Sequence, residues 1–428
     1  MSKYKSFIFK NYEFEGKVLT LTYALDDVLT FRETYAFDFD FSDNVDSALL
    51  DRSLQSLFFM AGVSYYKTYL PSEIIIEKGG LDQENASFFN KTYQKGLGEF
   101  FYTNQLDPKT PINFPNNSSS LQPVTANDNE GLLVGIGGGK DSLLSIELLR
   151  SQPKVATWSL NHRSQLEPLV QEVGLKHFWV TRDWDEQLLE LNKQDAYNGH
   201  IPISAIFACV GAIVAILTGY KDVVVSNENS ANEPNLTYQG VPINHQYSKS
   251  LEFEKDFQSY LHHIADDSFQ YYSFLRPLSE LRIAELFSKI GFEKYKNVFS
   301  SCNRAFAHDS DHMFWCSVCP KCAFTFLALT PFVAREKLET LFHGKNLLLD
   351  ASLEPTYRQL LGIEGDKPLE CVGEIKEARS AMELAKKQYT ELSKYQYELP
   401  AGYDYKALAP HSMPEGLFKI LESALQPE

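Results

Sequence analysis

The clearest chemical pattern in the chain lies at residues 131–150, where three glycines precede a short polar group. An apolar run at 132–136 predicts a buried strand, and the apolar residues of 143–149 predict a helix. The turn between them contains Gly137, Gly138, Gly139, Lys140, Asp141 and Ser142. Glycines let the backbone approach a ligand closely, and a helix N-terminus offers unpaired N–H groups and a positive dipole end to an anion. The stretch therefore predicts a phosphate-binding loop.

Two common phosphate-binding patterns do not fit this turn. The Walker pattern needs a glycine where Val134 stands and Ser or Thr where Asp141 stands, and the dinucleotide pattern G-x-G-x-x-G would have to end at Lys140. The turn resembles instead the Ser-Gly-Gly-x-Asp-Ser loop of the PP-loop ATP pyrophosphatases, with Gly137 in the Ser position. That resemblance implies an enzyme that splits ATP into AMP and pyrophosphate while it activates a carboxylate or carbonyl as an adenylate. The alternative is a glycine turn that binds no ligand.

Four of the six cysteines have a spacing typical of a metal site. The pattern C-x13-C-x2-C-x2-C consists of Cys302, Cys316, Cys319 and Cys322. In a cytoplasmic chain disulfides are disfavoured, so closely spaced cysteines indicate a metal. Four thiolates suit a closed tetrahedral zinc site, which holds loops together rather than catalyses. The alternatives are unrelated thiols and an iron–sulfur cluster, although the spacing differs from a standard ferredoxin pattern.

Three further residues have less specific signals. Cys209 lies in an apolar segment and is interpreted as a small core residue. Cys371 falls outside the metal spacing, and it is either a buried thiol or a proton-transferring thiol in a site. His308 lies inside the cysteine loop, where its spacing gives only a weak indication of substrate contact.

A polar stretch follows a short apolar run at 223–226. It contains Asn227, Glu228, Asn232, Glu233 and Asn235. Composition alone is compatible with an Asn-rich loop without a ligand. The functional interpretation is a polar wall of a site, in which the glutamates hold magnesium or act as bases and the asparagines bind substrate.

Strands and helices that alternate after residue 131 would position these groups. Apolar runs at 155–160, 177–180 and 223–226 predict further strands, with helical patterns between them. Such alternation predicts an α/β fold with a doubly wound parallel sheet. Ligands of these sheets bind at the carboxyl ends of the strands, so residues 137–142, 159–163 and 226–235 are expected to surround one crevice.

The chain is predicted to divide into four parts. Residues 1–107 form an N-terminal α+β domain with no obvious catalytic residue, in which alternation predicts a strand at 35–41 with partner strands at 18–23 and 28–31. Residues 108–130 are rich in Pro, Asn and Ser and form a linker. The PP-loop domain comprises residues 131–300, and residues 301–428 form a C-terminal zinc-binding helical region.

Composition limits the partners. The formal net charge is -16, and the chain has no run rich in Lys and Arg, which argues against a nucleic acid as partner. The N-terminus lacks the apolar segment of a signal peptide, so a cytoplasmic location is predicted. The most apolar stretch, 203–217, is short for a membrane span and predicts a helix buried against the sheet, with no membrane as partner.

Several motifs together resemble one family more closely. They are G-G-G-K-D-S, S-N-E-x-S-A-N-E-x-N, C-x2-C-P-K-C-x-F and E-C-V-G, with two N-terminal segments that end at Lys67 and Phe101. The combination is similar to the UDP-N-acetylmuramoyl-L-alanyl-L-glutamate epimerase family (MurL). The resemblance implies ATP-dependent conversion of a terminal L-glutamate to D-glutamate in a nucleotide-sugar peptide, with Mg²⁺ and with release of AMP and pyrophosphate.

The resemblance also implies roles for individual residues. The β,γ-phosphates would contact Gly137, Gly138, Gly139 and Ser142. Lys140 would balance phosphate charge, and Asp141 would hold magnesium directly or through water. Adenine and ribose would bind near Ser159, Asn161 and Arg163. The substrate would face Asn227, Glu228, Asn232, Glu233 and Asn235. Candidates for the acid/base pair are Glu228, Glu233, His308 and Cys371.

Two other classes of function stay open on the sequence. One is a different adenylating enzyme, either an amide ligase or a nitrile-forming synthase. The other is a zinc-stabilised nucleotide-binding protein without turnover. Product analysis separates the first class from an epimerase, because epimerisation leaves the mass of the substrate unchanged, whereas ligation requires an amine. The oligomeric state has no signal in the sequence.

Overall fold

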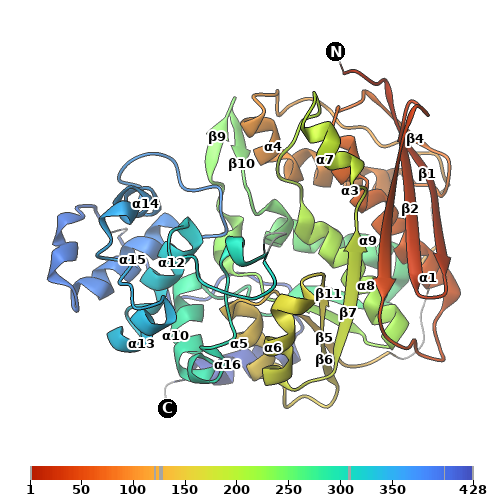
Figure 1. The fold of residues 1–428 in the computed structure, drawn as a ribbon. Coiled ribbons are helices and arrows are strands. Elements are labelled where there is room, and N and C mark those ends of the chain that lie inside the picture. Colours follow the sequence, from red (N-terminus) through yellow and green to blue (C-terminus); the bar gives the residue numbers. More distant parts are fainter. Residues whose placement is uncertain (1, 120–121, 125–128, 307–309, 400, 427–428) are drawn as a thin grey trace.

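A nine-stranded sheet forms the centre of the molecule (Figure 1). The computed structural model describes residues 2–119, 122–124, 129–306, 310–399 and 401–426. In spatial order the strands are β11 (Gln270–Ser273), β8 (Asp222–Val225), β5 (Leu132–Gly135), β6 (Val155–Leu160), β7 (His177–Asp183), β3 (Leu29–Phe37), β2 (Val18–Leu25), β1 (Ser6–Glu15) and β4 (Glu73–Ile76). A separate hairpin consists of β9 (Leu236–Tyr238) and β10 (Val241–Ile243).

The five strands from β11 to β7 are parallel, with β5 between β8 and β6. The strands predicted at 132–136, 155–160, 177–180 and 223–226 are therefore confirmed, and β11 is an additional strand. Because these strands run in one direction, their carboxyl ends share one edge of the sheet. The glycine turn, residues 161–163 and the polar stretch after β8 all begin at that edge.

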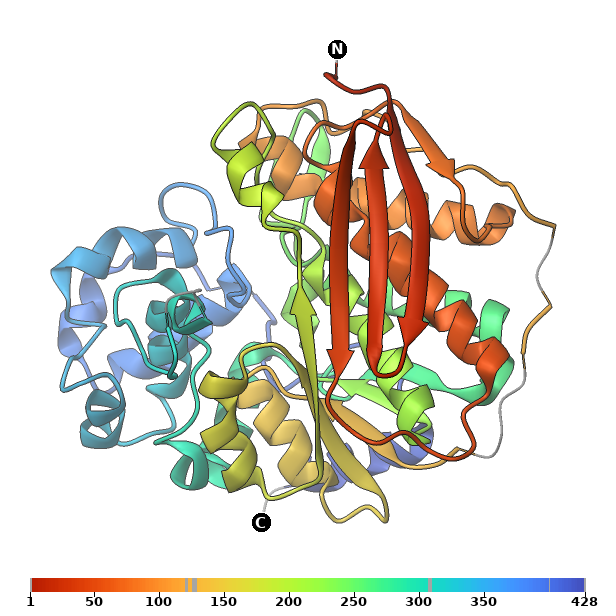
Figure 2. The same cartoon turned by 45° about the vertical axis from the view of Figure 1, so that its right-hand side comes forward.

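The rest of the sheet is mostly antiparallel and belongs to the N-terminal region. β3 pairs antiparallel with β7, with Tyr35 opposite Arg182. β2 and β1 continue the antiparallel order, and β4 joins β1 in parallel. Figure 2 shows the three red strands β1, β2 and β3 side by side, next to the long strand β7. One sheet thus passes through the regions predicted as the N-terminal and PP-loop domains, so the fold is mixed α/β with a large, mostly parallel sheet. The likeness to the PP-loop fold and the domain boundaries stay predictions.

The strand predicted at 35–41 is wrong at both ends. β3 begins at Leu29, so most of the separate strand predicted at 28–31 belongs to β3 itself, and β1 supplies the further partner of β2. β3 ends at Phe37. The alternation continues beyond it because Phe39 still packs against the sheet, with its ring centroid 5.0 Å from that of Phe178.

Helices cover both faces of the parallel strands, and each face has its own core. Side chains of β5 alternate between them, with Leu133 in one core and Leu132 and Val134 in the other. The first core includes residues of α1 (Ser47–Ala61), α3 (Gln83–Gly96), α8 (Ile203–Thr218) and α9 (Leu251–Ala265). The second core includes residues of α5 (Lys140–Leu149), α6 (Arg163–Val173), α10 (Glu280–Ile290) and α12 (Pro320–Leu329). The helices therefore lie as a doubly wound sheet requires.

The apolar stretch 203–217 forms α8, as predicted. The helix packs against α1 and against β5, β6 and β8. Gly211 allows this close approach, because a Cβ atom there would lie 2.9 Å from the Trp158 ring. Cys209 is buried in the core. Among the residues that the structure describes, no helix has the length and apolarity to cross a membrane.

The remaining helices are short or C-terminal. They are α2 (Val63–Tyr66), α4 (Gly98–Thr103), α7 (Gln187–Asn192), α11 (Phe292–Tyr295), α13 (Arg335–Leu341), α14 (Glu354–Leu360), α15 (Ile375–Lys386) and α16 (Glu415–Leu425). The 3-10 turns are η1 (Asn229–Asn232), η2 (Tyr247–Lys249), η3 (Asp266–Ser268), η4 (Asn303–Phe306), η5 (Ala351–Leu353) and η6 (Thr390–Lys394). Helices α12 to α15 group on one side of the molecule, away from the antiparallel strands, and α16 returns to pack against α5 (Figures 1 and 2).

Candidate active site

The glycine turn joins β5 to α5 and has the geometry of an anion-binding loop. Gly139 is the N-cap of α5, so the N–H groups of the first helical turn face the loop. Gly138 has φ +86°, and a Cβ atom there would lie 2.8 Å from Phe306 Cζ and 3.2 Å from the Ser300 carbonyl oxygen, so only glycine fits. Gly137 is exposed, and a Cβ atom there would meet no described atom within 4 Å. The turn therefore has space for an anion beside it.

Lys140 lies beneath the turn in a buried group of charges. Its ammonium donates to Asp141 Oδ1 at 2.5 Å and to Glu280 at the start of α10. Burial alone lowers the pKa of Lys140, but the two carboxylates outweigh it and raise the pKa above its ordinary value. In this structure Lys140 therefore neutralises carboxylates rather than facing the open side of the turn. Ser142 is buried, and its hydroxyl donates to the Gly139 carbonyl at 3.2 Å.

Asp141, Glu228 and Glu280 form a carboxylate group beside the turn. One oxygen of each lies within 4.8 Å of the others, and both glutamates are buried. Carboxylate oxygens are the ligands that Mg²⁺ prefers in proteins. Sequence reasoning predicted Asp141 and Glu228 as ligand candidates and missed Glu280, which lies far along the chain with no motif around it.

A cavity of about 1030 Å³ lies at the carboxyl ends of β6 and β7. Asn161 and Arg163 line it, together with Trp179, and Phe306 of the cysteine loop closes it toward Gly138. Asn161 Oδ1 accepts from Arg182 N at 2.5 Å, and the Arg163 guanidinium lies 5.3 Å from the Trp179 ring centroid. The volume suits a nucleoside-sized ligand.

Ser159 lies behind this cavity rather than on its surface. It is buried, and its hydroxyl makes a 3.0 Å hydrogen bond with His177 Nε2. Burial and the charge of Arg163 lower the pKa of His177 to about 3, so its imidazole is neutral. Of the three residues predicted near adenine and ribose, the structure brings Asn161 and Arg163 together at the cavity.

The polar stretch 227–235 turns at η1 and attaches to other segments. Asn232 Oδ1 accepts from Leu251 N at 2.7 Å at the start of α9. Glu233 accepts from Lys367 at 2.8 Å, and Asn235 Nδ2 donates to the Pro368 carbonyl at 2.9 Å. Asn227 is half-buried, and its carbonyl accepts from Ser273 Oγ at 2.6 Å. These contacts tie the stretch to the loop that contains Cys371. Roles in substrate binding stay predictions.

Cys371 is half-buried and surrounded by cations. Lys249 Nζ donates to its sulfur at 3.2 Å, and Lys321 donates to its carbonyl oxygen. Burial alone raises the pKa of the thiol, but the charge of Lys249 and the interaction with His245 outweigh it and lower the pKa to about 5. The Cys371 charge in turn raises the pKa of Lys249, which also interacts with Glu228 and Asp141. The cations around Cys371 therefore favour its thiolate form, and Lys249 links the thiol electrostatically to Glu228 and Asp141.

His245 connects Cys371 to the N-terminal region. Its Nδ1 is hydrogen-bonded to Glu99 of α4, and its ring centroid lies 4.4 Å from that of His200. Burial alone lowers the pKa of His245, but Cys371 and Glu99 raise it to about 9. Burial and the neighbouring His245 lower the pKa of His200 to about 4, so only one of the two rings carries a charge near pH 7.

Arg276 fixes the backbone of two site residues. It is fully buried, and it donates to the carbonyl oxygens of Glu228 at 2.6 Å and of Lys249 at 2.5 Å. Glu254 balances its charge, accepting at 2.9 Å and 3.1 Å. No local sequence pattern pointed to Arg276, His245 or Lys249. Glu99 lies in one of the N-terminal segments that resemble the MurL family, and that likeness was its only signal.

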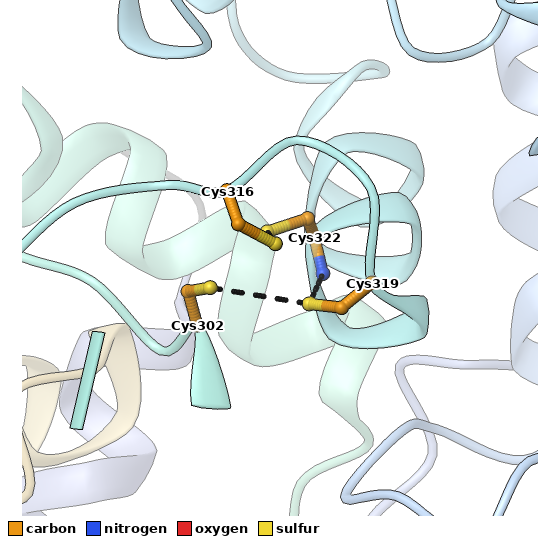
Figure 3. A group of neighbouring side chains, drawn as sticks. All are labelled: Cys302, Cys316, Cys319 and Cys322. Atoms are coloured by element: carbon orange, nitrogen blue, oxygen red, sulfur yellow. Dashed lines mark hydrogen bonds between the residues drawn. The ribbon is translucent and has the colours of Figure 1, made fainter. Parts of the chain in front are cut away.

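The four predicted cysteines meet at one point, as Figure 3 shows. Cys302 Sγ lies 4.0 Å from Cys319 Sγ, and Cys316 Sγ lies 3.7 Å from Cys322 Sγ. A tetrahedral ion with bonds of about 2.3 Å to sulfur separates its sulfurs by about 3.8 Å. The cluster could therefore bind a metal. Ser300 N, two residues before Cys302, donates to the Gly138 carbonyl at 3.0 Å, so the cluster anchors a segment that covers the glycine turn. His308 falls outside the described residues.

Fold and site together define a class of protein. It is a mixed α/β protein whose candidate site lies at the carboxyl edge of parallel strands, under a segment anchored by four cysteines. Comparison with known families narrows this class. Residues 1–274 match the model of the MurL N-terminal domain, and residues 298–396 match that of the MurL C-terminal domain. The chain belongs to the MurL family.

Individual relatives agree with this assignment. A UDP-N-acetyl-alpha-D-muramoyl-L-alanyl-L-glutamate epimerase from Xanthomonas oryzae pv. oryzae is 41% identical over 375 residues, which cover 85% of this chain and 82% of the relative. Proteins with the same name from a Micromonospora species and from Salinispora tropica are 40% and 38% identical. These two matches cover 80% and 90% of this chain, and 76% and 85% of the relatives. The resemblance inferred from the motifs is thereby confirmed.

The lowered pKa of Cys371 predicts unusual alkylation. Its thiolate persists as the pH falls until about 5, so iodoacetamide should modify Cys371 at nearly equal rates at pH 8 and pH 6. An ordinary thiol loses about a hundredfold in rate over the same interval, because its thiolate fraction falls. Lys249→Met should raise the thiol pKa and restore that pH dependence. Peptide mass spectrometry gives the rate at each cysteine, and a hundredfold decrease for wild-type Cys371 would contradict the assignment.

Proposed function

We propose that the protein converts the terminal L-glutamate of UDP-N-acetylmuramoyl-L-alanyl-L-glutamate to D-glutamate, with cleavage of ATP to AMP and pyrophosphate. Family membership over most of the chain and the names of three relatives support the epimerase activity. The observation that carries the use of ATP is the open glycine turn at a helix N-terminus, between a nucleoside-sized cavity and three carboxylates. A UDP-sugar peptide is thus the proposed partner, and consumption of ATP agrees with the predicted cytoplasmic location.

ATP would extend from the cavity to the glycine turn. Adenine and ribose would occupy the space beside Trp179, Asn161 and Arg163. The phosphates would reach the N–H groups of residues 137–142, where the dipole of α5 favours negative charge. Phe306 borders both regions, which supports one continuous binding path.

Adenylation solves a chemical problem of this epimerisation. The α-proton of a carboxylate is difficult to remove, because the carbanion would form next to a negative charge. Attack of the α-carboxylate of glutamate on the α-phosphate of ATP forms an acyl-adenylate and releases pyrophosphate. That group is a neutral acyl centre, whose carbonyl accepts the electron pair left by the proton. Water then cleaves the adenylate of the epimerised product and releases AMP.

Asp141, Glu228 and Glu280 are the residues that would hold Mg²⁺. Their oxygens lie within 4.8 Å of one another, which fits a shared divalent cation, and Lys140 supports the same carboxylates. When bound, magnesium neutralises phosphate charge and orients the α,β-bridge for displacement. Asn227, Asn232 and Asn235 remain candidates for contact with the substrate peptide.

Zn²⁺ is the proposed ion at Cys302, Cys316, Cys319 and Cys322. The sulfur separations of 3.7 Å and 4.0 Å fit four bonds to one tetrahedral ion. With four protein ligands the site is closed, so its role is structural. Phe306 and Met313, which lie between Cys302 and Cys316 in the sequence, would then keep their place against Gly138.

The first functional prediction concerns Asp141. Asp141→Asn keeps the size of the side chain and removes its charge, so release of pyrophosphate with ATP and substrate should decrease by roughly 10²-fold or more. Asp43→Asn changes an exposed carboxylate and serves as control. Circular dichroism checks that both variants fold. Near-normal pyrophosphate release by folded Asp141→Asn would refute the loop assignment.

The second prediction concerns the order of steps. In deuterated water, deuterium should enter the glutamate α-position with ATP and Mg²⁺, and not with an ATP analogue whose α,β-bond cannot be cleaved. Chiral analysis of hydrolysed glutamate by mass spectrometry measures both exchange and inversion. Exchange at a comparable rate without ATP would exclude activation through an adenylate.

The third prediction concerns the metal. Cys316→Ser removes one thiolate, so the zinc content should fall from about one ion per chain to a small fraction, and the unfolding temperature should decrease because structural zinc contributes folding energy. Cys209→Ala, in the core of α8, should keep the metal. Elemental analysis of the purified proteins measures zinc. Wild-type protein without zinc would contradict the assignment of a zinc site to the four cysteines.

A further inference from the structure

We propose that Cys371 removes the α-proton of the activated glutamate and that His245 returns a proton to it. Glu99 and Lys249 act as positioning residues. This inference rests on the proposed function and names the proton-transfer groups within it. His245, Lys249 and Glu99 had no role in the sequence-based predictions, and Cys371 was one of four candidates for the acid/base pair.

The sulfur of Cys371 contacts cationic side chains and is not enclosed in the hydrophobic core. Lys249 Nζ lies 3.2 Å from it, His245 interacts with the same sulfur, and Lys321 holds the Cys371 carbonyl. The side chain is only partly buried, so a substrate can reach it. Reactive thiols occur in such electropositive, partly exposed surroundings, whereas structural thiols are buried among apolar groups, as Cys209 is.

His245 is held by contacts on both its backbone and its ring. Asn235 Oδ1 accepts from its backbone N–H at 3.0 Å, and Glu99 bonds its Nδ1. Because Nδ1 faces Glu99, proton transfer to a substrate would use Nε2. A carboxylate on the far nitrogen fixes the ring and stabilises the imidazolium, which is the form that donates a proton.

The two groups are carried by separate segments, as inversion requires. Cys371 lies in the loop before α15, and His245 lies after β10, at the end of the small hairpin. Entry of the α-carbon between them replaces their mutual contact and places the two groups on different faces. Arg276 donates to the carbonyl oxygens of both Lys249 and Glu228, and the charges of Glu228 and Asp141 raise the pKa of Lys249, so this pair lies on the side of the carboxylate group, where the substrate carboxylate would be activated.

The other candidates are committed to different contacts. Glu233 is paired with Lys367 at 2.8 Å, and Glu228 belongs to the carboxylate group with Asp141 and Glu280. A base within that group would compete with the cation that the carboxylates are suited to hold. Among the described candidates, Cys371 has its own cationic surroundings and access to substrate.

The proposed step balances without an added reactant. The α C–H bond breaks, S–H forms on Cys371, and the electron pair of the C–H bond moves into the acyl carbonyl as an enolate. Nε2 of His245 then gives its proton to the opposite face of the α-carbon and becomes neutral. The thiol proton passes to that imidazole, which restores the thiolate and the imidazolium.

The test compares Cys371→Ser with wild type in deuterated water containing ATP, Mg²⁺ and UDP-N-acetylmuramoyl-L-alanyl-L-glutamate. Pyrophosphate released in the first turnover reports activation, and α-deuterium in chirally separated glutamate reports proton transfer. Cys371→Ser should still release pyrophosphate in the first turnover, while α-deuteration should decrease by roughly 10²–10⁴-fold, the usual contribution of a positioned base. Cys209→Ala should keep both activities. If Cys371→Ser does not fold, iodoacetamide modification of folded wild type replaces it, with the same expectation.

His245→Gln gives a different signature. Cys371 can still remove the proton and return deuterium from the same face, so deuterium should appear in L-glutamate without D-glutamate. His262→Gln, at an exposed histidine of α9, should behave as wild type. Formation of D-glutamate at the wild-type rate by His245→Gln would overturn the role of His245.

The pH dependence of the epimerisation rate tests the positioning role of Glu99. The charged or titratable groups that interact with His245 are Glu99, Cys371, His200 and Glu370. Because Glu99 raises the pKa of His245, Glu99→Gln should lower it, and the alkaline limit of epimerisation should move to lower pH while first-turnover pyrophosphate release is kept. An unchanged alkaline limit would contradict this role.

The outcomes separate this inference from the proposed function. Wild-type rates of epimerisation in Cys371→Ser, or parallel loss of first-turnover pyrophosphate release and α-deuteration in the folded variant, would overturn the assignment of Cys371. α-Deuteration by the wild type without ATP would instead refute activation through an adenylate. If that ATP-independent α-deuteration were lost in Cys371→Ser, the result would still support Cys371 as the base.

Discussion

Compensation of buried charge is the constraint on which the site depends. Lys140 is enclosed between Asp141 and Glu280, and fully buried Arg276 is balanced by Glu254. Removal of one partner from a buried pair typically costs about 3–5 kcal/mol, because the other charge stays uncompensated. Lys140 joins α5 to α10, and Arg276 holds the backbone at both Glu228 and Lys249. The contacts that neutralise these charges therefore also set the geometry of the site.

The N-terminal region contributes to the site through the same sheet that supports the parallel strands. Pairing of β3 with β7 makes the two regions continuous, and α4 then places Glu99 against His245. From the other direction, Glu233 and Asn235 attach the loop that contains Cys371. Residues as far apart in the sequence as Glu99 and Cys371 are thus brought into one region of the fold. A role limited to packing does not account for the position of Glu99.

Sequence patterns predicted features that depend on neighbouring residues. The glycine turn, the four parallel strands, helix α8 and the cysteine cluster each have a local period or spacing, and the structure contains them all. The pairing of β3 with β7, and the contacts of Glu280, Lys249 and His245, depend on which distant segments meet, and no local pattern encodes that. The strand predicted at 35–41 failed for a related reason, because Phe39 packs against Phe178 after the strand has ended. Hydrophobic alternation reports burial, and burial does not require a strand.

The same constraint orders the proposed chemistry. An approaching substrate carboxylate adds negative charge to a region that already contains Asp141, Glu228 and Glu280, and the first two of these interact with Lys249 beside Cys371. Repulsion would keep a free carboxylate away from the thiolate, and the cations around Cys371 are already engaged with it. Conversion to an acyl-adenylate removes that charge from the α-carboxyl group. Activation would then have two effects. It would acidify the α-carbon, and it would weaken the repulsion between the thiolate and the adjacent carboxyl group. Proton transfer before activation would be disfavoured for both reasons.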